Sequence, residues 1–366
     1  MTETIFLGIV VFLCMLAIFD LVVGVSNDAV NFINSAIGTK AASFKVIIAI
    51  AAIGVFAGAA TSNGMMDVAR HGIFTPEYFT FYEVMCIFLA VMVTDVVLLD
   101  VFNTLGMPTS TTVSMVFELL GGAFALALLK MAHGAVGPDG NLLNLGNLIN
   151  TDKALSVILA IFLSVAVAFV FGTLVMWLSR LVFSFVKPNN RSIKTILFGG
   201  LSATTIIWFL LINGLKSASF MTADVKDAIN DNTVVVLLIC FAASSIVMAL
   251  LSLMRVNILK TVVLIGTFAL AMAFAGNDLV NFVGVPLTGL DAYNDFTANG
   301  SGNPDTFMMQ SLQESAHTPI LYLLAAGLVM VLSLIFSKKA QNVVKTSVDL
   351  SRQDEGDEMF GSSAIA

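Results

Sequence analysis

Long uninterrupted apolar runs fill most of the sequence, and they restrict the possible folds more than any other feature. Of the 366 residues, 58% are hydrophobic and only 11% are charged, whereas soluble domains usually carry about 25% charged residues. Many runs reach the ~20 residues that a helix needs to cross a bilayer, and they lack the alternation of a β-barrel. The sequence therefore predicts an all-α, polytopic membrane protein surrounded by lipid. The expected location is a cell membrane, such as the bacterial inner membrane.

The expected membrane segments lie between the polar interruptions of these runs. They are Ile5–Val23 with a continuation through Gly38, Val46–Met66, Val84–Phe102, Pro108–Leu129, Ala154–Val186, Thr195–Leu215, Thr233–Leu253, Ile258–Leu290 and Pro319–Phe336. Ala154–Val186 is too long for one straight crossing, so we expect it to tilt or to protrude from the bilayer.

One eight-residue motif occurs twice, as VSNDAVNF at Val25–Phe32 and as AGNDLVNF at Ala275–Phe282. The first copy runs from an acidic terminus toward Lys40, whereas the second begins after Lys260 and leads to a loop without Lys or Arg (291–318). Because short loops rich in Lys and Arg stay in the cytoplasm, the two copies cross in opposite directions. This pattern predicts inverted-topology repeats, with a site near the bilayer midplane on broken or re-entrant helices.

The motifs also suggest how the chain is organised. We expect a first transmembrane repeat (1–136), connecting loops and helices (137–232), a second, incomplete repeat (233–337) and a polar cytoplasmic tail (338–366). Short loops rich in Lys and Arg, such as Lys187–Lys194, are expected inside the cell, and Arg70 and His71 are expected in a solvated loop.

Asp28 and Asp278 lie at the centre of the two motifs, where a carboxylate costs on the order of 2.5–3.5 kcal/mol. Neither segment supplies a cationic side chain, since residues 1–39 and 261–337 contain no Lys or Arg. A metal cation, a bound proton or a residue from elsewhere remains as partner. A cation suits the surrounding amide oxygens best; an ordinary helix cap is the alternative. The amides are those of Asn27, Asn31, Asn277 and Asn281.

The stretch GMPTSTTVSM, from Gly106, places four hydroxyl residues directly after Pro108. Pro is favoured in the first turn of a helix, and a helix N-terminus lined with hydroxyls binds anions without a formal positive charge. An ordinary Ser/Thr cap is the alternative. Asp95, Asp100 and Glu118 flank this stretch as further cation ligands, proton carriers or boundary residues.

Together the three motifs resemble those of the inorganic phosphate transporter (PiT) family, which carries G-A-N-D-V-A-N, P-V-S-T-T-H and a second G-A-N-D-V. The resemblance implies a symporter that moves phosphate with sodium, or with protons in some members, while close relatives carry sulfate. It implies that Asp28, Asn31, Asp278 and Asn281 hold sodium, which is then a co-substrate and not a cofactor. It implies that phosphate is held by Asn27, Ser110, Thr111, Thr112 and Asn277. A homodimer is plausible.

The chain departs from the family pattern at several positions. Val25 and Ser26 replace Gly and Ala, Val113 stands where His is usual, and no acid lies between Asp28 and Asp67. A second P-x-S-T-T motif does not follow Asn281. We therefore expect either that the sequence is truncated or that further helices complete the site.

Three other functions remain open from the sequence. A proton-coupled phosphate or sulfate permease is the nearest alternative. An intramembrane aspartyl protease would use Asp28 and Asp278 as a catalytic pair, but such enzymes carry G-x-G-D where this chain has SND and GND. A channel would conduct without coupling. The net charge of −7 argues against a nucleic-acid partner, and no His–acid constellation suggests an enzyme.

Overall fold

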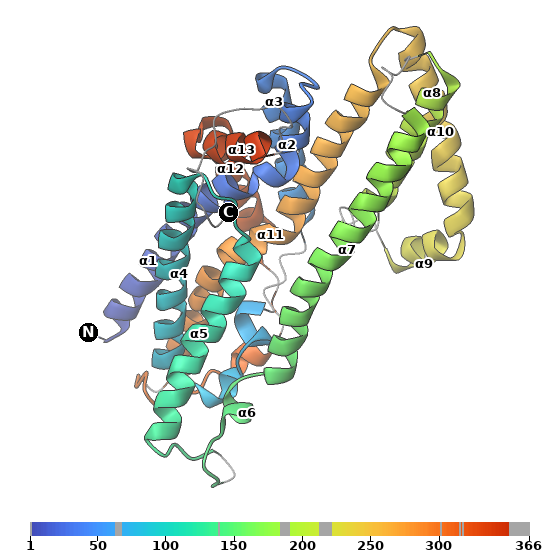
Figure 1. Cartoon of the computed structure of the whole chain (residues 1–366). Helices are drawn as coiled ribbons and strands as arrows, with labels where there is room; N and C mark the ends of the chain where they lie inside the picture. Colours follow the sequence, from blue (N-terminus) through green and yellow to red (C-terminus); the bar gives the residue numbers. More distant parts are fainter. Residues whose placement is uncertain are drawn as a thin grey trace, which may run out of the picture.

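The computed structural model describes residues 2–62, 68–137, 140–183, 191–211, 222–300, 302–314, 316 and 318–350, and they form helices joined by short loops (Figure 1). The α-helices are α1 Thr2–Asp28, α2 Val30–Gly38, α3 Phe44–Thr61, α4 Phe81–Leu105, α5 Thr111–Ala132, α6 Leu145–Leu148, α7 Thr151–Phe183, α8 Ile193–Phe209, α9 Ala223–Asp231, α10 Thr233–Leu253, α11 Ile258–Asn299, α12 Ile320–Phe336 and α13 Lys338–Leu350. Shorter turns are η1 Val68–Gly72, η2 Pro76–Tyr78 and η4 Gln310–Gln313.

The predicted polytopic membrane architecture is confirmed. Seven helices in the described part of the chain are long and apolar enough to span a bilayer, counting α1 and α2 as one stretch. The helices α12 and α13 add an eighth span if this pair, bent by 66°, is counted as one. The predicted ends at Met66, Val186 and Leu215 fall outside the described residues.

The two motif-bearing helices, α1 and α11, pack against each other in opposite directions. Near the start of α1, the ring of Phe6 lies 6.3 Å from that of Phe296, near the end of α11. Near the end of α1, Gly24 lies so close to Phe282 that an added Cβ would be 2.1 Å from its ring. The opposite threading of the two motifs, predicted from loop charges, is therefore present.

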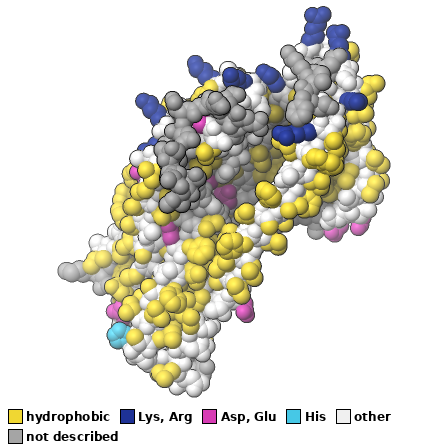
Figure 2. Space-filling model, in the orientation of Figure 1, with side chains coloured by type: hydrophobic (Ala, Val, Ile, Leu, Met, Phe, Trp, Pro, Cys, Tyr) yellow, Lys and Arg dark blue, Asp and Glu magenta, His cyan; other side chains and the backbone are white. Residues whose placement is uncertain are grey.

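Figure 2 shows the charge asymmetry behind that prediction, with Lys and Arg side chains gathered at one end of the molecule. The connections α2–α3 and α10–α11 meet at this end, where the Lys260 ammonium donates to the Lys40 carbonyl oxygen at 2.8 Å. The positive-inside rule predicts that this end faces the cytoplasm and that the end of α11 faces the outside.

Helix α7 runs along the outside of the helix assembly (Figure 1). Its 33 residues span roughly 50 Å at 1.5 Å per residue, more than the ~30 Å hydrocarbon core. Ala154 is its only buried residue. Such an apolar, exposed helix is suited to contact with lipid.

The helix breaks expected at the motifs are smaller than predicted. Only Ala29 separates α1 from α2, and it keeps helical angles (φ −52°, ψ −32°). At the second motif the predicted break is absent, because α11 continues through Asp278 to Asn299. Neither aspartate caps a helix N-terminus, so the capping alternative is excluded. The polar side chains find partners on another hairpin, as described below, and the backbone therefore need not open.

Arg70 was expected in a solvated loop, and this expectation is wrong. The side chain of Arg70 is only 7% exposed and pairs with the Asp291 carboxylate at 2.8 Å. Its guanidinium also donates to the backbone oxygens of Glu314 and Ser311. The partners lie more than 200 positions away in the sequence, so local charge patterning could not reveal them.

The first part of the predicted polar tail forms helix α13, which packs across the cytoplasmic ends of α1, α2 and α4. Its apolar face buries Ala340, Val343 and Val344. The Ser337 hydroxyl lies 2.6 Å from that of Ser26, and Lys339 forms an ion pair with Asp100. Residues 351–366 of this tail lie outside the described residues, and the division into two repeats stays a prediction.

Gly58 tests the close packing of α3 on α11. A Cβ at Gly58 would lie 2.1 Å from the Met272 carbonyl oxygen, so G58A must push the two backbones apart at a cost of about 1–3 kcal/mol. We expect a lower unfolding temperature of the purified protein in detergent. Gly121, which has nothing within 4 Å of an added Cβ, is the matched control, and G121A should stabilise its helix by up to about 1 kcal/mol. Equal unfolding temperatures for both variants would contradict this packing.

Candidate functional site

The hydroxyl motif forms the tip of the α4–α5 hairpin. Helix α4 ends at Leu105, and the next residue, Gly106, turns the chain with a left-handed backbone (φ 70°) that glycine readily adopts. Helix α5 begins at Thr111, after Ser110, whose hydroxyl accepts a hydrogen bond from the Val113 amide. The predicted helix N-terminus is therefore present, and Ser110 acts there as an ordinary helix cap. Anion binding at this helix end stays a prediction.

Asn27 anchors this tip to the end of α1. Its Oδ1 accepts from the Thr109 amide at 2.7 Å, and its Nδ2 donates to Asn103 Oδ1 at 2.8 Å and to the Met107 carbonyl at 3.1 Å. The side chain is fully buried. Asn27 therefore positions the tip, and both of its amide hydrogens are engaged by the protein. Its direct contact with phosphate stays a prediction.

Asn103 completes this network and was missed in the sequence. Its Nδ2 donates to the Val23 carbonyl oxygen at 2.7 Å, so that it links α4 to α1. Asn103 is fully buried. The available signal was an amide in an otherwise apolar run, three residues before Gly106, and it resembles interhelical hydrogen bonding in membranes.

Two adjacent threonines at the start of α5 bring the two motifs together. Thr111 Oγ1 donates to Asp28 Oδ2 at 2.8 Å, and Thr112 Oγ1 lies 3.3 Å from Asp278 Oδ1. Asn281 Nδ2 donates to Thr112 Oγ1 at 2.9 Å. Since neighbouring residues contact both carboxylates, the site predicted from two distant stretches is a single cluster.

The cluster has a buried side and an open side. Asn27, Asp28 and Thr111 are buried, whereas Thr112, Asp278 and Asn281 are half-buried. The remaining predicted residues, Asn31, Ser110 and Asn277, are exposed. Figure 2 shows that the molecular surface is hollowed beside α7, with acidic side chains visible in the hollow.

Each predicted sodium ligand pair is held in the same way. Asn31 Nδ2 donates to Asp28 Oδ1 at 3.2 Å, and Asn281 Nδ2 lies 3.4 Å from Asp278 Oδ1. Each amide thus turns its nitrogen to the acid and leaves its carbonyl oxygen for another partner. Asn277 differs, because its side chain makes no hydrogen bond to any described residue.

Within the described residues, no ion pair neutralises Asp28 or Asp278. Lys130 pairs with Glu83, Arg70 with Asp291 and Lys339 with Asp100. No group of three or more His, Cys, Asp and Glu side chains is placed to hold a metal ion in this part of the chain. The site instead offers two carboxylates with amide and hydroxyl oxygens, which suit a hard cation.

The comparisons with known proteins fit this site. The model of the phosphate transporter family matches residues 24–346, a stretch that contains all three motifs. The chain belongs to the phosphate transporter family. Membership makes it a transporter and not an enzyme, which removes the aspartyl protease alternative. No curated protein sequence matches the chain.

A solved structure described as "the sodium-dependent phosphate transporter" has the same fold as this phosphate transporter family member. Its TM-score is 0.67 at 17% sequence identity, and the match covers 93% of this chain and 78% of that one. The likeness supports the helical arrangement described above.

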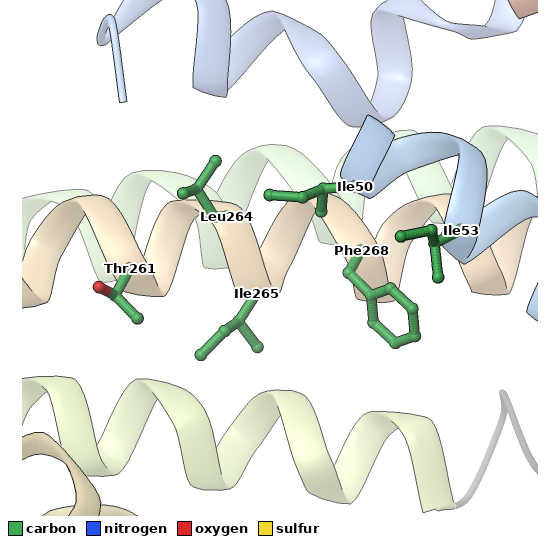
Figure 3. Close-up of a pocket in the computed structure, with 6 residues that line it drawn as sticks. All are labelled: Ile50, Ile53, Thr261, Leu264, Ile265 and Phe268. Carbon is green, nitrogen blue, oxygen red and sulfur yellow. The ribbon is translucent and has the colours of Figure 1, made fainter. Parts of the chain in front are cut away.

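An apolar pocket between α3 and α11 is separate from this cluster (Figure 3). It is lined by Ile50 and Ile53 from α3 and by Thr261, Leu264, Ile265 and Phe268 from α11. Thr261 is the only polar side chain drawn there. A pocket with this lining cannot replace the hydration shell of phosphate, so it is not the transport site of this family member.

Replacing Asn103 tests the network behind the tip. N103L removes the acceptor of one Asn27 amide hydrogen and the side-chain donor to the Val23 carbonyl oxygen, and the loss of these buried hydrogen bonds costs about 1–3 kcal/mol. We expect a clearly lower unfolding temperature in detergent. N299L, at an exposed position near the end of α11, is the control and should have little effect. If both variants unfold like the parent, the buried amide network does not hold the tip.

Proposed function

We propose that the protein imports inorganic phosphate into the cell and couples this import to sodium ions. One observation carries the proposal: Thr111 and Thr112, adjacent at the N-terminus of α5, contact Asp28 and Asp278 respectively. An anion-binding helix end and two potential cation sites therefore share one small volume. Sodium acts as a co-substrate, and no separate cofactor takes part.

Phosphate would bind at the N-terminus of α5. The first amides of a helix have no partner within the helix, and the helix dipole attracts anions there. The exposed Ser110 hydroxyl is available to donate to the anion, whereas Thr112 would contribute its backbone amide, because its hydroxyl hydrogen is directed to Asp278. The exposed side-chain amide of Asn277, which bonds to no described residue, is available from α11. These groups bind an oxyanion without a Lys or Arg.

Sodium would bind on either side of the phosphate, at Asp28 with Asn31 and at Asp278 with Asn281. Without cations, a phosphate dianion next to two carboxylates would suffer strong repulsion at this depth. Two monovalent cations offset the charge of the dianion and make occupation by all three ions favourable. Binding of each ion then strengthens binding of the others, which is the basis of coupled transport.

Proton coupling and sulfate transport are the alternatives within the same class. Hydrogen phosphate carries an O–H group that can donate to Asp28 or Asp278, whereas sulfate has no donor at neutral pH. A site with acceptor carboxylates therefore favours hydrogen phosphate, which can donate a hydrogen bond to them, over sulfate, which cannot. A channel is a separate alternative; it would conduct ions in electrical recordings without coupling. A bacterial inner membrane location stays a prediction.

Neutralising the motif acids tests the sodium sites. D28N and D278N keep the side-chain shape but remove the charge that would hold sodium, so we expect sodium-dependent uptake of radiolabelled phosphate to fall at least about tenfold. The measurement is initial uptake into proteoliposomes with and without sodium. D152N, at an exposed position of α7, is the control and should transport like the parent. Unchanged sodium-dependent uptake in both D28N and D278N would reject the proposal.

Thr112 tests whether the hydroxyl cluster is needed by both motifs. T112V removes the hydroxyl that contacts Asp278 and Asn281, while T112S restores it. We expect kcat/KM for phosphate uptake to fall about tenfold or more in T112V, since a hydrogen bond to a charged group contributes about 1.5–3 kcal/mol. T112S should recover most of the activity. If T112V transports like the parent while T112S does not, side-chain volume and not the hydroxyl matters, and this role is contradicted.

A further inference from the structure

A second group of acids lies outside the motif cluster. Asp20 precedes Asp28 by about 12 Å along α1 at 1.5 Å per residue, and Asp95 of α4 and Glu118 of α5 lie within electrostatic reach of it. Asp20 is fully buried, and neither of its carboxyl oxygens has a hydrogen-bond partner among the described residues. Asp95 is likewise buried, and Glu118 is half-buried with an unpartnered Oε2.

The two contacts of Ser114 indicate that one of the neighbouring carboxyl groups binds a proton. Ser114 Oγ lies 2.7 Å from Asp95 Oδ1 and 2.8 Å from Glu118 Oε1. A hydroxyl has a single hydrogen, so it can donate to one carboxylate only. The second contact becomes a hydrogen bond only if the other carboxyl is protonated and donates to Ser114.

Asp20 needs a donor for the same reason. Asp95 is the acid with the strongest electrostatic effect on Asp20, and Glu118 and Asp28 are the other acids within electrostatic reach. No described Lys or Arg forms an ion pair with Asp20, Asp95 or Glu118. Two facing carboxylates share a hydrogen bond only when one of them carries a proton.

A proton suits this group better than a metal ion. Ser114 can hydrogen-bond to both Asp95 and Glu118 only when one of these carboxyls is protonated. The other elements packed on α1 are α11, α12 and α13. The acids of α11 include Asp278, in the motif cluster, and Asp291, paired with Arg70. Helix α12 has no acid or base, and Lys339 of α13 is paired with Asp100.

We propose that Asp20, Asp95 and Glu118, linked by Ser114, form a proton-binding site that loads and unloads during transport. A proton enters at the half-buried Glu118, which donates to Ser114 Oγ while Ser114 passes its own hydrogen to Asp95. Asp95 then donates to Asp20. Each transfer moves one proton between oxygens, so the atoms and charges balance. The inference builds on the proposed phosphate transport and adds protons as a second coupled ion.

The transport experiment uses proteoliposomes with equal sodium on both sides and a clamped membrane potential. An inward gradient of one pH unit should raise phosphate accumulation in the parent protein by up to about tenfold, as for one coupled proton. D20N mimics the protonated acid, so its accumulation should respond much less to the gradient while sodium still stimulates uptake. E118Q, which lies at the half-buried entry, should behave similarly. D152N is the control and should respond like the parent.

Comparison among variants removes the effect of phosphate protonation in water, which is the same for all of them. If D20N and E118Q respond to the gradient as D152N does, the proton site is overturned. Failure of the proposed function looks different, because then the parent itself shows no sodium-stimulated phosphate uptake.

A second measurement does not depend on transport. Infrared difference spectra of the parent, recorded between neutral and alkaline pH, should contain the carbonyl stretch of a protonated carboxyl that shifts in heavy water. This band should be missing or displaced in D20N and kept in D152N. Spectra of D20N that match those of the parent would overturn the inference, including when the variant folds but transports poorly.

Discussion

The structure depends on the interaction between two intramembrane carboxylates and the hydroxyl-bearing end of one helix. A carboxylate buried in a bilayer is unfavourable unless polar groups surround it, and Asp28 and Asp278 obtain those groups from neighbouring threonines of α5. The rest of the scaffold serves to hold that helix end in place. Asn27 and Asn103 fasten the hairpin tip to α1, and the antiparallel packing of α1 on α11 brings the second motif opposite the first.

Much of the fold follows from the sequence because membrane helices must satisfy their own backbone hydrogen bonds. Apolar runs therefore located the helices, and the loop charges correctly gave opposite directions to the two motifs. The positions of Asp28, Asp278, Thr111 and Thr112 in one cluster were predicted from repetition of a polar pattern in apolar surroundings. These signals are local in the sequence, so a single sequence is enough to detect them.

Other features depend on partners distant in sequence, and they were not predicted. Arg70 looks like a loop residue until Asp291 and Glu314 are brought beside it. Asn103 is a lone amide until Asn27 and Val23 face it. The break at the second motif was expected because a buried aspartate needs polar neighbours. Because Thr112 of α5 supplies a polar neighbour for Asp278, α11 keeps its backbone hydrogen bonds.

The same hairpin explains how one hydroxyl motif can serve both halves of the site. Asn281 and Asp278 use Thr112, while Asp28 uses Thr111, so a second hydroxyl stretch is not needed to complete the contacts seen here. This asymmetry has a mechanical consequence. Any displacement of the α5 N-terminus changes the surroundings of both carboxylates at once, whereas separate hydroxyl stretches would allow them to change independently. With sodium and phosphate bound as proposed, a shared helix end ties the occupancy of both cation sites to the anion between them, which is the linkage that coupled transport requires.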